Sequence, residues 1–254
     1  MFHSVIIATK GRAPVVKETI KNILQQDSQV DEIIVSATHA SDVDGLNNSG
    51  KIKSILGSVG LTVQRNAAIR CLDPKCTIVT FLDDDVELAP NYFQVLNSFF
   101  QSRSDIIAVG GNPRLDGCTR SEAQKCLAII DENPASKEWL VPSLYGCNMS
   151  FRRDVIEGVQ FDERLRLYGW LEDYDFSVRV SDKGPIAVLS DLKLCHLRTP
   201  TGRMNHQKFG FAQVMNPCYL VQKGTMSWKD LLRFHLFPLL IANLVGLLKV
   251  QLID

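Results

Sequence analysis

The chain has 254 residues, 45% hydrophobic and 22% charged, which is an ordinary composition for a globular protein. Lysine plus arginine equals aspartate plus glutamate at 28 each, so the zero net charge gives no reason to expect nucleic-acid binding. The seven cysteines follow no paired-ligand spacing, and we interpret them as reduced thiols. Residues 1–9 do not resemble a signal peptide, so we expect a cytoplasmic location.

The first hundred residues alternate between apolar, β-branched runs and amphipathic stretches. This pattern predicts strands over residues 5–9, 32–37, 77–82 and 106–109, with helices over 15–24, 61–72 and 89–100. A polar segment over 38–50 reads as a loop. Such alternation favours an α/β fold with a mainly parallel sheet.

The regular alternation of strand and helix patterns ends after Gly110 and Gly111. We expect a strand edge at 149–153, a helix over 171–180 and a strand over 186–194. No internal repeat or low-complexity linker interrupts the chain. One continuous domain with a C-terminal helical extension is therefore the expected organisation.

The apolar strand over 77–82 leads directly into Asp83, Asp84 and Asp85. A buried parallel strand delivers its last residues to the sheet edge where open α/β folds bind ligands. Hard carboxylate oxygens there suit Mg²⁺ or Mn²⁺ carrying a phosphate. The alternative is that these residues only cap a turn or solvate a loop.

A second acidic cluster, Glu172 and Asp173, begins the helix expected over 171–180. Helix capping alone would explain carboxylates at this position. A carboxylate beside Gly169 and Trp170 would also be partly desolvated, which raises its pKa and makes it a better general base.

Five segments in order, at residues 9–12, 64–68, 81–85, 146–153 and 161–173, resemble the family 2 glycosyltransferases. The resemblance extends over roughly residues 3 to 200. It implies a GT-A fold, which is a single Rossmann-like, mixed and mainly parallel sheet flanked by helices. It also implies a nucleotide-sugar donor, a Mn²⁺ or Mg²⁺ cofactor, hexosyl or deoxyhexosyl transfer, and inversion at the anomeric carbon.

The same resemblance implies roles for individual residues. Asp85 would ligate the cation and Asp83 would lie near the ribose or donor sugar, while Asp173 would be the catalytic base and Glu172 would orient the acceptor or the base. The roles of Glu172 and Asp173 could be exchanged. The residues implied on the donor side are Thr9, Arg12, Arg65, Asp83, Asp84 and Asn148.

His196 follows the last expected strand, where some relatives carry a further metal ligand. Its imidazole is compatible with Mn²⁺, although a partly buried histidine of no special role is the alternative. The second strand lacks the acidic residue with which many relatives read the base. Asp42 or Asp44 could substitute, and thymidine, uridine and guanosine donors all stay open.

We expect a nucleotide-sugar-binding half at 1–110, an acceptor-binding half at 111–200 and an extension at 201–254. The expected acceptor is a glycan or lipid-linked glycan, in polysaccharide biosynthesis. The apolar run at 234–248 is shorter than the roughly 20 residues of a spanning helix, so it could lie on a membrane, pack on the domain or contact a second subunit. Two alternative functions for the protein stay open: a sugar-nucleotide pyrophosphorylase, or a non-catalytic GT-A scaffold in a polysaccharide assembly.

Overall fold

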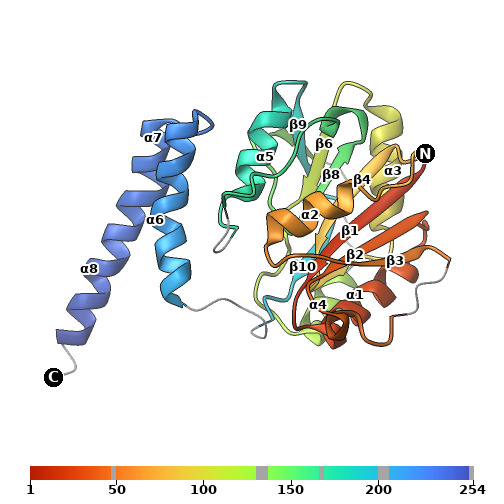
Figure 1. Cartoon of the computed structure of the whole chain (residues 1–254), viewed down its shortest axis with the longest axis horizontal. Helices are drawn as coiled ribbons and strands as arrows, with labels where there is room; N and C mark the ends of the chain where they lie inside the picture. The colour runs from red at the N-terminus through yellow and green to blue at the C-terminus, as the bar shows by residue number, and fades with distance from the viewer. Residues whose placement is uncertain (47–49, 130–136, 166–168, 200–205, 252–254) are drawn as a thin grey trace.

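The computed structural model describes residues 1–46, 50–129, 137–165, 169–199 and 206–251 (Figure 1). Within them, eight strands form one sheet in the order β3-β2-β1-β4-β8-β6-β9-β7. These strands are β1 (His3–Thr9), β2 (Glu32–Ala37), β3 (Ile52–Leu56), β4 (Ile78–Asp83), β6 (Ala108–Gly111), β7 (Glu138–Leu140), β8 (Asn148–Arg152) and β9 (Ile186–Leu189). A separate pair consists of β5 (Val86–Leu88) and β10 (Leu194–His196).

The large sheet is mixed and mainly parallel. Strands β3, β2, β1 and β4 run parallel, and β8 is inserted antiparallel between β4 and β6. Strand β9 is parallel to β6, and β7 is antiparallel to β9. This arrangement confirms the expected α/β, GT-A type of sheet. It also brings the carboxyl ends of β1, β2 and β4 to one edge, where ligands bind in open α/β folds.

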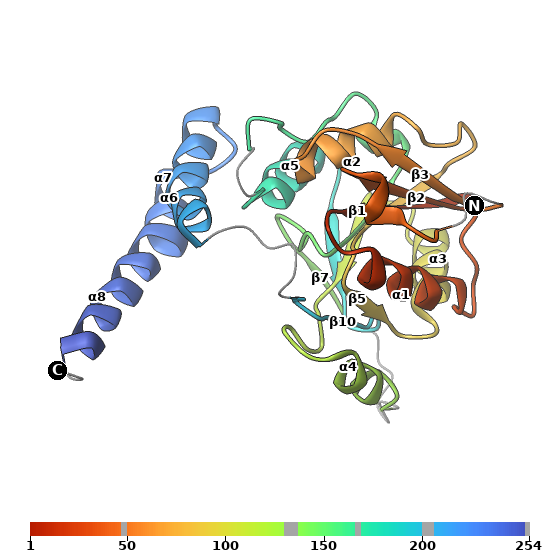
Figure 2. The ribbon, with the colours of Figure 1, turned by 60° about the horizontal axis from the view of Figure 1, so that its bottom comes forward.

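Helices cover both faces of the sheet (Figure 2). Because side chains alternate along a strand, Val5 and Ile7 of β1 enter one hydrophobic core while Ile6 enters the other. The first core includes apolar residues of α1 and α3, and the second includes residues of α2 and α5. The helices of this part are α1 (Ala13–Leu24), α2 (Leu61–Ile69), α3 (Tyr92–Ser102), α4 (Arg120–Leu127) and α5 (Glu172–Ser181).

Some elements differ from the sequence expectation. Residues 186–194, expected as one strand, form β9 and β10 in two different sheets. The loop expected at 38–50 contains a short 3₁₀ helix, η1 (Ala40–Val43), and residues 47–49 lie outside the described residues. Gly110 and Gly111 are the last residues of β6. The missing side chain of Gly111 lets the backbone of Leu192 approach, since a Cβ at Gly111 would lie 1.9 Å from the carbonyl oxygen of Leu192. Strands β3 and β7 and helix α4 had no sequence expectation.

The C-terminal part is helical and stands beside α5, away from the sheet (Figure 1). It comprises α6 (His206–Lys223), α7 (Trp228–Asp230), the π-helix η3 (Leu231–Leu236) and α8 (Phe237–Gln251). Among the described residues, no helix combines the length and apolarity needed to cross a membrane. Residues 200–205 and 252–254 of the extension expected at 201–254 lie outside the description.

A buried ion-pair hub joins α6 to α5. Asp175 of α5 is fully buried, and its carboxylate accepts hydrogen bonds from Lys223 (2.8 Å), Arg179 (2.8 Å) and Thr225 (3.0 Å). Lys223 also donates to Asp162 at 2.8 Å. The position of α6 is therefore coupled to the helix that begins with Glu172 and Asp173.

We expect Lys223→Met to loosen the C-terminal helices from α5. The methionine keeps most of the side-chain volume but leaves Asp175 with Arg179 as its remaining charged partner, which should lower the free energy of unfolding by about 2 kcal/mol. Limited proteolysis should cut near residue 224 faster than in the wild type. Lys229→Met, at an exposed lysine of α7, is the control, and equal cleavage of both variants would contradict the coupling.

Candidate active site

The three aspartates lie where β4 ends and the chain turns into β5. Asp83 is the last residue of β4, and β5 begins two residues after Asp84. Strand β5 pairs antiparallel with β10 in the register that sets His196 opposite Val86. This pairing brings His196 beside Asp85, although the two residues are far apart in the sequence.

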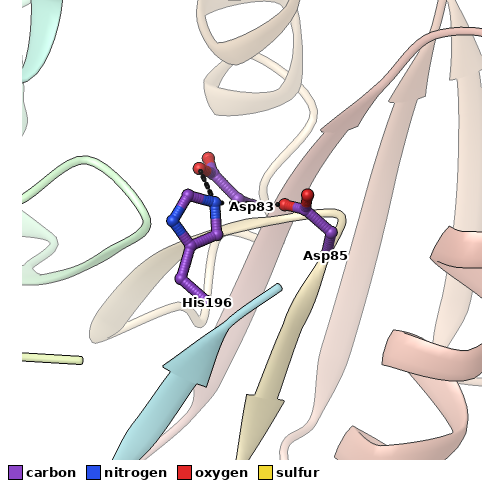
Figure 3. A group of neighbouring side chains, drawn as sticks. All are labelled: Asp83, Asp85 and His196. Carbon is purple, nitrogen blue, oxygen red and sulfur yellow. Dashed lines mark ion pairs between the residues drawn. The ribbon is translucent and has the colours of Figure 1, made fainter. Parts of the chain in front are cut away.

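Asp83, Asp85 and His196 form a compact group whose side chains point toward one another (Figure 3). The Nε2 atom of His196 lies 3.3 Å from Asp85 Oδ1 and 3.6 Å from Asp83 Oδ2. One ligand atom from each residue fits within 4.8 Å of the others. Two carboxylates and an imidazole are a donor set that suits Mn²⁺, so the residues present fit a divalent cation.

The protonation of His196 is tied to these carboxylates. Burial lowers the pKa of His196, but the hydrogen bond to Asp85 and the neighbouring negative charges outweigh burial and raise it above its ordinary value. His196 and Arg12 in turn outweigh the effect of burial on Asp85 and lower the pKa of that carboxyl. A cation bound here would therefore compete with the proton on His196.

Asp84 is not a member of this group and binds the end of β1 and the loop that follows it. Its carboxylate accepts hydrogen bonds from Thr9 Oγ1 and Arg12 Nη1, both at 2.7 Å. Burial raises the pKa of Asp84 to about 6, although Arg12 and Thr9 oppose the rise. Arg12 also donates to the carbonyl of Thr199 at 3.1 Å, and the Thr199 N–H donates to Asp85 at 2.7 Å. The donor-binding roles of Thr9, Arg12 and Asp84 stay predictions.

Arg65 connects the two acidic clusters. It is a buried side chain of α2, only 2% exposed, so it is not a helix-surface arginine. Its guanidinium lies 3.1 Å from Glu172 Oε1 and 3.3 Å from Asp83 Oδ1, and it donates to the carbonyl of Gly146 at 2.8 Å. Its role toward the donor stays a prediction.

Glu172 and Asp173 open α5 after Leu171, which adopts a left-handed conformation with φ of 70°. Asp173 accepts hydrogen bonds from the backbone N–H groups of Gly146 and Tyr174, both at 2.8 Å. Burial raises the pKa of Asp173, and these two N–H groups oppose the rise by stabilising the ionised form. Burial and the neighbouring Asp173 raise the pKa of Glu172 to about 8, against the effect of Arg65. Glu172 therefore carries the proton at neutral pH, and Asp173 is the better candidate base.

Glu172 should make the stability of the protein depend on pH. Its pKa is about 8 in the folded protein and 4.5 ordinarily, so the folded state holds the extra proton between these values. The free energy of unfolding should consequently fall as pH rises from about 4.5 to about 8. The glutamine side chain of Glu172→Gln is neutral at every pH, so we expect this fall in the free energy of unfolding to disappear in the variant. Melting temperatures measured across this range test it, and an unchanged pH dependence in the variant would contradict the assignment.

Asn148 lies inside the sheet and is fully buried. Its amide Nδ2 donates to the carbonyl of Gly111 at 2.8 Å, and its Oδ1 accepts from the Gly111 N–H at 2.6 Å. Both ends of the amide thus extend the contact between β8 and β6. Its expected donor-binding role stays a prediction.

Asp42 holds the loop after β2. Its carboxylate accepts from the N–H groups of Gly11 (2.7 Å), His39 (2.9 Å) and Thr38 (3.1 Å). Burial raises its pKa, but these hydrogen bonds outweigh burial and lower it. Whether Asp42 or Asp44 reads the nucleotide base stays open as a prediction.

The model of the glycosyl transferase family 2 matches residues 4–159, which is more than half of the chain. The chain belongs to glycosyltransferase family 2. The matched region contains β1, β4 and the three aspartates, and it ends before Glu172, Asp173 and His196. A comparison with curated protein sequences found no match.

Solved structures with a similar fold include glycosyltransferases. The mannosyltransferase PcManGT from Pyrobaculum calidifontis, in complex with GDP-Man and Mn²⁺, has a TM-score of 0.58 and 15% identity, over 98% of this chain and 80% of that chain. TarS 1–349 from S. aureus has a TM-score of 0.59 and 16% identity, over 87% and 66%. GalNAc-T7 with UDP, GalNAc and Mn²⁺ has a TM-score of 0.62 and 14% identity, over 80% and 45%. At these identities the comparison shows the GT-A fold.

This family 2 glycosyltransferase has a cavity of about 500 Å³ beside Asp173. Its walls come from β7, from the segment before β8 and from the start of α5. The lining includes Trp139, Tyr145, Leu171, Asp173 and Tyr174. Trp139 is 49% exposed and Tyr145 39%, so aromatic surface is available at the mouth. Faces of aromatic rings next to a carboxylate suit a sugar, whose C–H groups pack on rings while its hydroxyls seek acceptors.

Sequence reasoning missed one residue of the site, Asp116. Asp116 Oδ1 lies 3.0 Å from His196 Nδ1, and Asp116 also pairs with Arg198. A carboxylate on the far nitrogen fixes the ring orientation of a metal-ligating histidine. Asp116 carries no sequence signal, since it acts through contacts that only the folded chain makes. Gly146 belongs to the segment 146–153 of the resemblance, and the structure adds that a Cβ there would lie 3.0 Å from Asp173 Oδ2.

Proposed function

We propose that the protein is an inverting, metal-dependent glycosyltransferase that moves a hexosyl or deoxyhexosyl group from a nucleotide-diphosphate sugar to a hydroxyl of a glycan or lipid-linked glycan. One observation carries the proposal. The cation-compatible group of Asp83, Asp85 and His196 is joined through Arg65 to buried Glu172 and its half-buried neighbour Asp173. One centre suited to a diphosphate and one suited to an acceptor hydroxyl thus share a single site.

In this proposal Asp83, Asp85 and His196 hold Mn²⁺ or Mg²⁺. When bound, the cation neutralises charge on the departing diphosphate. Asp173 accepts the proton of the acceptor hydroxyl, whose oxygen bonds to the anomeric carbon as the bond from that carbon to the diphosphate oxygen breaks. Attack from the face opposite the leaving group inverts the anomeric configuration.

Arg65 and Glu172 position the base in this mechanism. Arg65 contacts both Asp83 and Glu172 and donates to the carbonyl of Gly146, whose N–H binds Asp173. Because Glu172 is neutral, no second negative charge lies beside Asp173 to repel its carboxylate. These contacts keep the base fixed relative to the cation-binding group, which is the geometric requirement of a displacement reaction.

A thermal-shift screen of nucleotide sugars with and without Mn²⁺ tests the function. We expect one donor class to raise the melting temperature by several degrees only when Mn²⁺ is present, because binding to the folded state alone stabilises it. The screen includes GDP-, UDP- and dTDP-sugars, and the matching nucleoside monophosphates are the control. If no nucleotide sugar stabilises the protein in the presence of Mn²⁺ or Mg²⁺, the proposal is wrong.

Trp139→Ala should weaken the acceptor and leave the donor unaffected. The ring lines the cavity beside Asp173, and its removal deletes one stacking surface without touching the cation-compatible group. We expect the KM for the acceptor to rise roughly tenfold, with the donor KM within about twofold. Steady-state kinetics with each substrate varied in turn provides the measurement. Leu56→Ala, at an exposed residue of β3, is the control, and an unchanged acceptor KM in Trp139→Ala would remove this residue from the acceptor site.

A further inference from the structure

The C-terminal helices expose an unusual amount of apolar surface. We call residues 228–246 the C-terminal arm; it runs from α7 through η3 into α8 and extends away from the sheet (Figure 2). Trp228 is 69% exposed, and the large apolar side chains Phe234, Phe237, Leu240, Ile241 and Leu244 are each 56–60% exposed. A contiguous apolar surface of this kind marks an interaction site.

The outward side chains of α8 repeat at helical spacing. Phe237, Leu240, Ile241 and Leu244 follow the positions i, i+3, i+4 and i+7 that define one face of a helix. The other residues between Phe237 and Leu244 are Pro238, Leu239, Ala242 and Asn243, and none of them carries a charge. Asn243 donates its side-chain N–H to the carbonyl of Leu239 at 2.8 Å, which satisfies that polar group within the helix.

This pattern distinguishes a lipid surface from a second copy of the chain. Helices that pair in water keep charged residues along the flanks and outer face of the pair. Residues 234–248 contain no aspartate, glutamate, lysine or arginine, so α8 carries no charge before Lys249 and has no charged face along most of its length. A bilayer accommodates such a helix, because its apolar side chains are buried at the boundary between headgroups and acyl chains.

The other end of the arm supplies groups suited to the lipid headgroups. Trp228, Lys229 and Arg233 are exposed on α7 and η3, and the Arg233 guanidinium lies 5.3 Å from the centre of the Phe234 ring. Tryptophan and basic side chains favour the membrane–water boundary, where the apolar part is buried and the charge stays hydrated. Positive charge also favours anionic lipid.

The arm is anchored to the acceptor side of the domain. Leu231 packs with Leu165, Leu220 and Met226 in a small hydrophobic core against which Leu171 and Tyr174 also pack. Leu171 and Tyr174 line the cavity beside Asp173 as well. The base of the arm and the acceptor cavity therefore share a wall.

We propose that the C-terminal arm binds the surface of a lipid bilayer, with the apolar face of α8 at the acyl boundary and Lys229 and Arg233 among anionic headgroups. The arm then holds the acceptor cavity near the membrane, so the acceptor is a lipid-linked saccharide. This second step rests on the proposed glycosyltransferase function, whereas bilayer binding does not.

Co-flotation of the full chain with vesicles tests bilayer binding without any donor or turnover. The vesicles are phosphatidylcholine alone or phosphatidylcholine with a third of phosphatidylglycerol. We expect the wild type to float with both, more with the anionic vesicles. The double variant Leu240→Ser, Leu244→Ser should reduce binding at least roughly tenfold, since each substitution removes a leucine that the bilayer would bury. Leu56→Ser, equally exposed on β3, should float like the wild type.

A second variant tests the basic end. Lys229→Gln combined with Arg233→Gln should reduce binding to anionic vesicles roughly tenfold and leave binding to phosphatidylcholine unchanged. The bilayer proposal is overturned if the wild type floats with neither vesicle, or if the double leucine variant floats normally. It is also overturned if light scattering shows a dimer that this variant dissociates while the wild type does not float. In that case the occupant of the surface is a second copy.

Discussion

Asp173→Asn is expected to lower kcat roughly 10²–10⁴-fold and to leave the affinity for the nucleotide sugar within about twofold. In the proposed mechanism the carboxylate accepts the proton of the acceptor hydroxyl, and an amide of the same size cannot. The donor side should be unaffected, because Asp173 belongs to α5 and to the cavity lining and is not a member of the cation-compatible group. Initial rates with saturating donor and acceptor give kcat, and calorimetry gives donor affinity.

Glu172→Gln is the matched control for this prediction. Glu172 holds a proton at neutral pH because burial and Asp173 raise its pKa to about 8, so glutamine imitates the form already present. The glutamine oxygen can still accept the hydrogen bond from Arg65, now 3.1 Å away. We expect this variant to retain activity within roughly tenfold. If Glu172→Gln abolishes transfer while Asp173→Asn turns over normally, the two residues exchange roles.

One structural side effect must be separated from catalysis. Both oxygens of Asp173 accept backbone N–H groups, from Gly146 and Tyr174, and asparagine offers only one acceptor. Asp173→Asn should therefore melt at a lower temperature, because one N–H loses its partner. Asp162→Asn, measured alongside, is the control for this loss of stability. If the two variants melt at similar temperatures, the loss of activity in Asp173→Asn does not come from unfolding. Asp162 also accepts several hydrogen bonds but lies outside the cavity lining.

Most elements of the first half of the fold, though not β3 and β5, could be predicted from the sequence because local signals and tertiary structure agree there. The apolar run before Asp83 is a buried central strand, and strict alternation sends Val5 and Ile7 to one core and Ile6 to the other. The resemblance to relatives, rather than any periodicity, suggested that His196 could join Asp85 at a metal, whereas Asp83, which lies in the same group, was expected beside the ribose or donor sugar.

The remaining features depend on contacts between distant residues. Residues 186–194 contain only Ser190, Asp191 and Lys193 as polar positions, and this pattern does not reveal that the chain leaves one sheet at Leu189 and joins another at Leu194. Gly111 reads as a strand end, yet its missing side chain is what lets Leu192 approach. The position of α6 likewise depends on Asp175 and Lys223, a pair 48 residues apart.

Asp85→Ala is expected to remove most of the gain in donor affinity that Mn²⁺ provides. In the presence of Mn²⁺, the donor affinity should fall roughly 100-fold. Asp85 lies 3.3 Å from His196 and also receives the Thr199 N–H, so its removal deletes one ligand and loosens the segment that carries Thr199. Donor affinity without metal should change little. Calorimetric titrations of the donor with and without Mn²⁺ give the ratio that defines the gain.

Asp84→Asn is the control that separates metal binding from the charge of the triplet. Asp84 bonds Thr9 and Arg12 rather than the cation-compatible group, and asparagine can keep both contacts because Arg12 needs an acceptor and Thr9 can reverse its hydroxyl. We therefore expect Asp84→Asn to keep the Mn²⁺-dependent gain within about threefold, although it removes the same unit of charge as Asp85→Ala. If both variants lose the gain equally, general electrostatics rather than ligation by Asp85 holds the metal. If Asp85→Ala keeps the gain, Asp85 is not a ligand.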